Sequence, residues 1–169
     1  MSTFIPISTV TVGSSGAANI EFTSIPSSYT DLVLYLSART TPTGGSAWQY
    51  VEVRLNGTTT SYTYKQLYSD GSSVTSGTGS LAAGAYANPD SNTANVFANS
   101  FTYISDYNSS ENKTYLNHAA TETNASSALI SLFSTTRANT AAVTSLTLVP
   151  QSGNFKQYTT ATLYGIKNS

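Results

Sequence analysis

The sequence VTSLTLVPQSGNFKQYTTATLYGIK, residues 143–167, decides the fold class that we predict for this chain. In its first part, 143–149, leucines alternate with serine and threonine, which is the period-2 pattern of a strand with one buried face. Pro150 has no amide hydrogen to donate to a sheet and therefore ends that strand. Gly153-Asn154 favours a turn, because both residue types tolerate positive φ. A second β-rich run, 158–167, follows, so the stretch predicts two strands that pair as a closing hairpin.

Similar alternation recurs along the chain, most clearly at 31–39, where three leucines share one face and Leu34 is the middle one. Asn56-Gly57 directly follows another alternating run and is the strongest short signal for a hairpin turn. It predicts that strands at 48–55 and 61–68 pair with each other. Less regular runs predict strands at 18–22, 81–86, 94–105, 114–122 and 128–134, the last of which also fits a short buried helix, and Ser- and Gly-rich residues 69–84 predict a long loop.

These runs amount to about eight to ten strands without an amphipathic helix, which predicts an all-β, antiparallel β-sandwich of the jelly-roll type. Residues 1–169 are expected to form a single domain, since a chain of this length buries one core. Residues 1–12 are β-prone but contain Pro6, which is accepted at sheet edges. We therefore expect an edge strand or an extended N-terminal arm there, and we leave both alternatives open.

Charge is scarce: 7 basic and 8 acidic residues give a net charge of −1, and charged residues are 9% of the chain. No basic stripe is available to neutralise phosphates, so nucleic acid is not an expected partner. The chain has no cysteine, which excludes disulfides and thiolate metal sites. The first residues show neither a signal peptide nor a long apolar run, so we expect synthesis in a cytoplasm and no membrane partner.

Catalytic chemistry has little support in the sequence. His118 is the single histidine, and no G-x-S-x-G motif accompanies it. Residues 88–92 place oxygen-bearing side chains at alternate positions, as calcium loops do, but the distal glutamate of such loops is missing, so a turn is the simpler interpretation. We predict no catalytic, cofactor-binding or metal-binding residue and no enzyme activity.

Tyrosine is abundant, with 12 residues in the chain. Half-buried sheet faces are one explanation, because tyrosine has high β propensity. The other explanation is an uncharged interface, since tyrosine is enriched and charge is depleted at interface cores. The candidate interface residues are Phe4, Ile5, Tyr86 and Tyr107.

Two motifs point to a family. One is S-x-T-L-x-P-x-S-G-N-F-x-x-Y-T-x-A-T-L-Y-G-I-K at 145–167, and the other is I-x-F-x-x-I-P-x-x-Y-T-D-L-x-L at 20–34. Both resemble sequences of small structural virion proteins from tailed bacteriophages, including phages of cyanobacteria. The resemblance implies a virion protein that is made in the cytoplasm of the host cell.

We expect a capsid decoration, or cement, protein that binds the major capsid protein on the capsid exterior and stabilises capsomer contacts. A homotrimer is expected, because shells offer local three-fold sites and closed symmetry satisfies identical interfaces. The alternative is a tail-associated or fibre-tip domain that binds a host-surface glycan, since jelly rolls also serve as lectins. A polysaccharide-degrading enzyme is the third possibility, but no acid–base pair can be named for it.

Overall fold

The structure is a computed structural model that describes residues 3–42, 47–122 and 128–167. Its regular structure consists of strands, and the described part of the chain includes no helix long and apolar enough to cross a bilayer. The twelve strands are β1 (Thr3–Thr11), β2 (Ile20–Phe22), β3 (Asp31–Thr40), β4 (Gln49–Leu55), β5 (Tyr62–Ser69), β6 (Val74–Gly79), β7 (Ala83–Pro89), β8 (Ala98–Ile104), β9 (Lys113–Thr121), β10 (Leu129–Arg137), β11 (Leu146–Pro150) and β12 (Thr160–Lys167).

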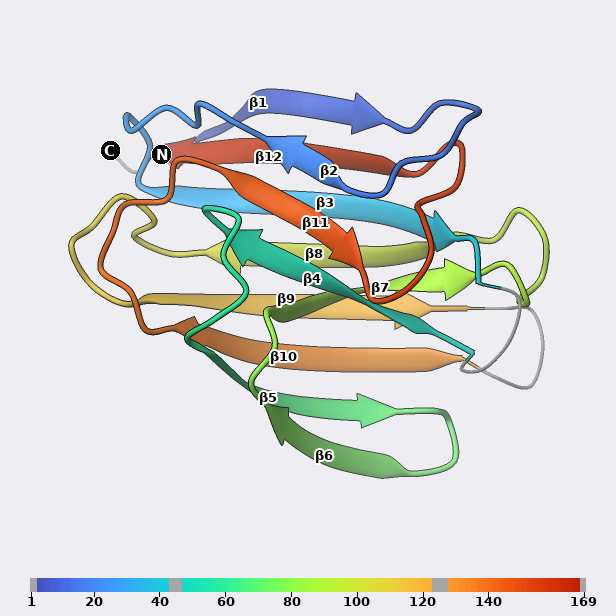
Figure 1. Cartoon of the computed structure of the whole chain (residues 1–169). Coiled ribbons are helices and arrows are strands. Elements are labelled where there is room, and N and C mark those ends of the chain that lie inside the picture. Colours follow the sequence, from blue (N-terminus) through green and yellow to red (C-terminus); the bar gives the residue numbers. More distant parts are fainter. Residues whose placement is uncertain (1–2, 43–46, 123–127, 168–169) are drawn as a thin grey trace.

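The strands form two layers that face each other (Figure 1). The large layer has the order β1-β12-β3-β8-β9-β10-β5-β6 and is antiparallel throughout. The small layer has the order β2-β11-β4-β7 and is also antiparallel. A short parallel contact, in which Arg39 and Thr40 of β3 pair with β7, joins the two layers. The predicted all-β, jelly-roll-like sandwich is confirmed, but it has twelve strands, divided eight and four, instead of the eight to ten expected.

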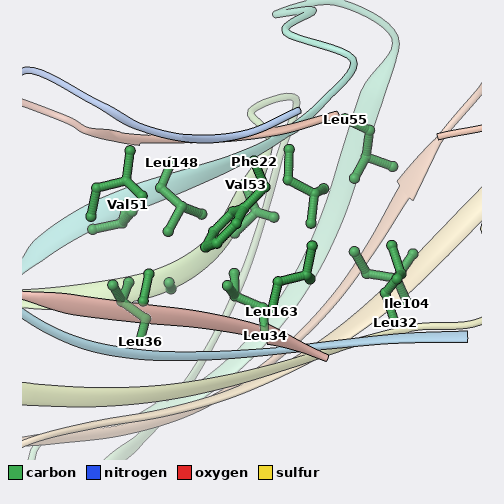
Figure 2. Close-up of a cluster of buried hydrophobic side chains, with 14 of the residues drawn as sticks. Phe22, Leu32, Leu34, Leu36, Val51, Val53, Leu55, Ile104, Leu148 and Leu163 are labelled. Atoms are coloured by element: carbon green, nitrogen blue, oxygen red, sulfur yellow. The ribbon is translucent and has the colours of Figure 1, made fainter. Parts of the chain in front are cut away.

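The core lies between the layers (Figure 2). Leu34 and Leu163 contribute from the large sheet, and Val53, Leu148 and Phe22 contribute from the small one. Every residue of this set is at most 3% exposed, as expected for alternating strands whose apolar sides meet. The inward orientation predicted for the leucines of 31–39 is therefore confirmed.

The predicted closing hairpin is wrong, although both of its strands exist. β11 pairs with β2 and β4 in the small sheet, whereas β12 pairs with β1 and β3 in the large one. The connector between them crosses from one layer to the other, and Gly153 makes its turn at φ +67°. Period-2 alternation identifies a strand and its buried side, but a strand of either sheet has the same pattern, so it does not identify the neighbour.

The hairpin predicted at Asn56-Gly57 is also wrong, because the strands before and after this turn do not pair with each other. Both residues have the positive φ that the signal predicts, 53° and 67°. However, β4 pairs with β7 and β11, and β5 pairs with β6 and β10. The Asn56 side chain accepts the amide of Thr144 at 2.8 Å and donates to the carbonyl of Ala142 at 2.9 Å. This turn therefore fastens β4 to the segment that leads into β11.

The structure also settles the expectations for residues 1–12, 69–84 and 128–134. β1 is an edge strand that pairs with β12 of the same chain, with a register shift between Pro6 and Ser8, so the extended arm is wrong for residues 3–11. The long loop expected at 69–84 instead contains β6, which forms a hairpin with β5. Residues 129–137 form a strand, β10, and no helix.

Candidate functional site

The outer face of the large sheet carries an unusual row of large side chains. Tyr35, Phe101, His118, Leu132 and Leu67 occupy paired positions on the adjacent strands β3, β8, β9, β10 and β5. Paired residues of neighbouring strands point to the same side of a sheet, so these five side chains stand side by side. All except the half-buried Phe101 are exposed. We call this set the outer row.

Additional apolar side chains extend the outer row toward both ends of the strands. Ile130 and Val74 lie on one side and are 66% and 77% exposed. Leu116 lies on the other side, two positions along β9 from His118, and Tyr164 of β12 lies there too, paired with Val33, which is two positions along β3 from Tyr35. An open groove of about 650 Å³ runs along the outer row, from Thr160 and Thr162 on β12 to Val74 on β6.

The aromatic rings on this face make consecutive edge-to-face contacts. Ring centroids are 6.4 Å apart for Phe4 and Tyr164, 5.9 Å for Tyr164 and Tyr35, 5.3 Å for Tyr35 and Phe101, and 6.1 Å for Phe101 and His118. Edge-to-face pairing is a favourable geometry for aromatic rings. The contacts join the rings into a continuous series across the outer face of the large sheet.

The groove lining is uncharged apart from the titratable His118. Lys65 borders an adjoining depression beside Leu116 and Leu132. Ser37, Asn99 and Ser69 supply hydrogen-bonding groups at the groove's rim. This combination resembles the centre of a protein interface, where apolar and aromatic groups are enriched and charges are depleted.

The predicted interface residues separate into two groups. Phe4 is 52% exposed and begins the series of ring contacts just described, and Ile5 is half-buried on the same edge strand. Tyr86 and Tyr107 are completely buried, so their assignment to an interface is wrong.

Both buried tyrosines have partners inside the chain that explain their position. Tyr86 stacks against Tyr50 with ring centroids 4.9 Å apart, and its hydroxyl accepts a hydrogen bond from Gln66 Nε2 at 2.5 Å. Burial, and next the hydrogen bond with Tyr50, raises the pKa of Tyr86. Tyr107 donates its hydroxyl hydrogen to the carbonyl of Pro26. A buried tyrosine needs a partner for its hydroxyl, and each of these residues has one.

The oxygen-rich turn at 88–92 is occupied by the chain's own cations. Asp90 binds Lys156 Nζ at 2.7 Å and Arg39 Nη2 at 3.1 Å. The guanidinium of Arg39 also donates to the carbonyls of Thr93 and Asn92 at 2.7 and 3.0 Å. These contacts use Asp90 Oδ1, one of the oxygens that a calcium ion would need. Across the described ranges, no group of three or more His, Asp and Glu side chains is arranged to hold a metal ion.

His118 stands on the outer face without a catalytic neighbourhood. It lies between Leu116 and Ala120 on the exposed side of β9, as the sequence predicts, and its ring contacts Phe101. No carboxylate lines the groove that contains it.

Comparison with known proteins gives no relative: no family model, no curated protein and no solved structure matches this chain.

Proposed function

We propose that this chain is a structural virion protein of a tailed phage, a capsid decoration protein that binds the outer shell through the outer row. The uncharged row of Tyr35, Phe101, Leu132 and Leu67 is the observation that carries the proposal. A surface of this kind gains free energy by removing apolar area from water. These four side chains are uncharged, so docking would not bury a charge without a counter-charge.

The partner we propose is the major capsid protein, reached on the exterior of the capsid after synthesis in the host cytoplasm. Low charge throughout the chain argues for a protein partner rather than nucleic acid, because phosphate binding needs Lys and Arg. The resemblance of residues 20–34 and 145–167 to phage virion proteins supports the same assignment. A homotrimer fits the local three-fold sites of a shell.

A glycan-binding domain of a phage tail is the second candidate function. Aromatic rings next to Asn99, Ser37 and Thr162 favour it, because sugars stack on rings and bind amide and hydroxyl groups at the same time. The two candidates differ in copy number. A decoration protein occurs in hundreds of copies in each particle, and a tail-tip domain occurs in a few dozen at most.

The experiment is add-back to particles of the encoding phage from which this protein has been depleted. Wild type is expected to rebind, with little change between low and high salt because few charges are available for screening. The double variant Phe101→Ser/Leu132→Ser removes the centre of the outer row and is expected to lose binding. Tyr158→Ser and Leu81→Ser, which change exposed apolar residues outside the groove lining, are matched controls that keep it.

Three results bear on the proposal. Decoration through this face is supported if the protein is present in hundreds of copies per particle and if the outer-row variant loses rebinding while the control variants keep it. If wild type does not bind depleted capsids but binds isolated tails or host polysaccharide, the decoration proposal is overturned and the glycan-binding candidate is favoured. Binding that collapses with modest salt contradicts the uncharged interface.

A further inference from the structure

Arg137, the last residue of β10, carries a buried guanidinium without an acceptor. Its side chain is on the inner side of the strand with Phe133 and Leu129, and the residue is 4% exposed. Nε and Nη1 are buried and have no hydrogen-bond partner, and no ion pair to Arg137 occurs in the described part of the chain. A guanidinium has five N–H donors, so this one is strongly undersatisfied.

A second buried cation lies directly opposite. Lys113, the first residue of β9, is paired in register with Arg137 and is 1% exposed. Its Nζ donates to the carbonyl oxygen of Ser109 at 2.8 Å and to that of Glu111, which leaves one of its three hydrogens without an acceptor. Burial, and next the charge of Arg137, lowers the pKa of Lys113. Two positive charges therefore lie close together inside the protein. The carboxylates of Glu111 and Asp106 attract Lys113 from a distance, but within the described residues neither cation forms a direct ion pair.

Arg39 shows how the same chain treats a buried guanidinium elsewhere. It is also 4% exposed, and it is bound by Asp90 and by the carbonyl oxygens of Thr93, Asn92 and Val96. Within the described ranges, Arg137 Nε and Nη1 have no such acceptor and form no ion pair. An unpaired buried charge strongly destabilises a fold unless a counter-charge with acceptor atoms compensates it.

We propose that Arg137 and Lys113 form a binding site for a small oxyanion, a phosphate or a carboxylate group. A guanidinium binds two oxygens of such a group through parallel N–H bonds, either from Nε and Nη2 or from the two Nη atoms, and a lysine ammonium adds a third contact. Arg137 is 4% exposed, so we expect a ligand of a few atoms rather than a larger one. The site is at the end of the sandwich, next to the 109–111 turn, and does not depend on which partner the outer row binds.

The test measures thermal unfolding of the full chain in concentration series of sodium phosphate, sodium acetate and sodium chloride at matched ionic strength. Because a ligand of the folded state stabilises it by mass action, wild type is expected to gain about 3–6 °C in melting temperature per tenfold increase in the bound oxyanion above its Kd. A response to phosphate identifies a site for free phosphate. A response to acetate alone identifies a site for a carboxylate, such as that of a partner side chain.

Arg137→Met removes the guanidinium and keeps an apolar side chain of similar length. It is expected to abolish the oxyanion response and to melt no lower than wild type in chloride, since an unpaired buried charge has been removed. Arg54→Met is the matched control, because Arg54 pairs with Glu52 at 2.8 Å elsewhere in the chain, and it is expected to keep the response.

A second readout on wild type does not depend on any variant folding. The Arg137 Nε–H resonance in a 15N-correlated spectrum is expected to shift on titration with the active oxyanion. Equal melting temperatures in the three salts together with an unchanged Nε–H resonance would overturn the proposal. So would an oxyanion response that Arg137→Met retains.

Discussion

Leu34 of β3 and Leu163 of β12 occupy paired positions in the large sheet, and both are completely buried. Their side chains face Val53 and Leu148 of the small sheet, at the centre of the core (Figure 2). The pair therefore contributes to the contact between the two layers from the large-sheet side.

Leu34→Ala is expected to lower the free energy of unfolding by about 2–5 kcal/mol, because it removes buried methyl groups and leaves a cavity. Urea unfolding followed by circular dichroism measures the change. Leu132→Ala is the control on the outer face, where the leucine is 47% exposed, and it is expected to have a much smaller effect. Equal losses for the two variants would contradict the assignment of Leu34 to the core.

Tyr62→Phe tests a hydrogen bond between the layers. The amide of Leu55 donates to the Tyr62 hydroxyl at 2.8 Å, and Tyr62 is 2% exposed. Removing the hydroxyl leaves a buried amide without an acceptor, which is expected to lower the free energy of unfolding by about 1–3 kcal/mol. Tyr158→Phe, at a highly exposed position, is expected to leave the urea midpoint unchanged.

Asp90 gives the stability of the protein a predictable dependence on pH. The hydrogen bond from Lys156, and with it that from Arg39, holds the pKa of Asp90 below its usual value. Because the pKa is lower in the folded than in the unfolded chain, the ionised carboxylate stabilises the fold at neutral pH, and this contribution is lost as the pH falls through the folded pKa.

The measurement is the melting temperature of wild type and Asp90→Asn as a function of pH. Asp90→Asn is expected to melt below wild type at pH 7, and the difference is expected to shrink as the pH falls below about 4, the usual pKa of an aspartate. A difference that stays constant down to strongly acid pH would show that the charge of Asp90 does not contribute.

Gly165→Ala tests a close approach between β12 and the 24–30 segment. A Cβ at Gly165 would lie 2.3 Å from Cγ of Tyr29, which is too short for any real contact. The ring of Tyr29 must then move away from the sheet, so the variant is expected to lower the melting temperature by several degrees. Gly13→Ala adds a methyl group where no heavy atom lies within 4 Å and is the matched control.

Local sequence patterns predicted where most strands lie but not which strands are neighbours. The alternation at 31–39 and at 143–149 identified the strands and their buried sides, since burial on one face imposes period 2. Asn56 made the predicted turn, yet its side-chain hydrogen bonds are to residues 142–145, far away in the sequence. A local sequence pattern carries no information about a contact between residues so far apart in the sequence.

The candidate site was only partly predictable for a related reason. Phe4 was assigned to an interface because it is an apolar residue of an N-terminal segment that Pro6 keeps extended, but Tyr86 could not be told from a surface tyrosine. All seven residues of β7 are buried, so this strand shows no alternation of exposure that would reveal its environment. The outer row was missed altogether, because Tyr35, Phe101 and Leu132 become neighbours only through the order of β3, β8, β9 and β10.

The position of β12 between β1 and β3 has a consequence for biosynthesis. Of the twelve strands, β1 and β3 are synthesised early and β12 is synthesised last. The edges of β1 and β3 that pair with β12 therefore stay unpaired until β12 is made. During that time β3 presents an unpaired apolar edge to other nascent chains, and such edges template intermolecular pairing. A lower rate of translation initiation is therefore expected to raise the soluble yield, because fewer incomplete chains are then present together before β12 is released.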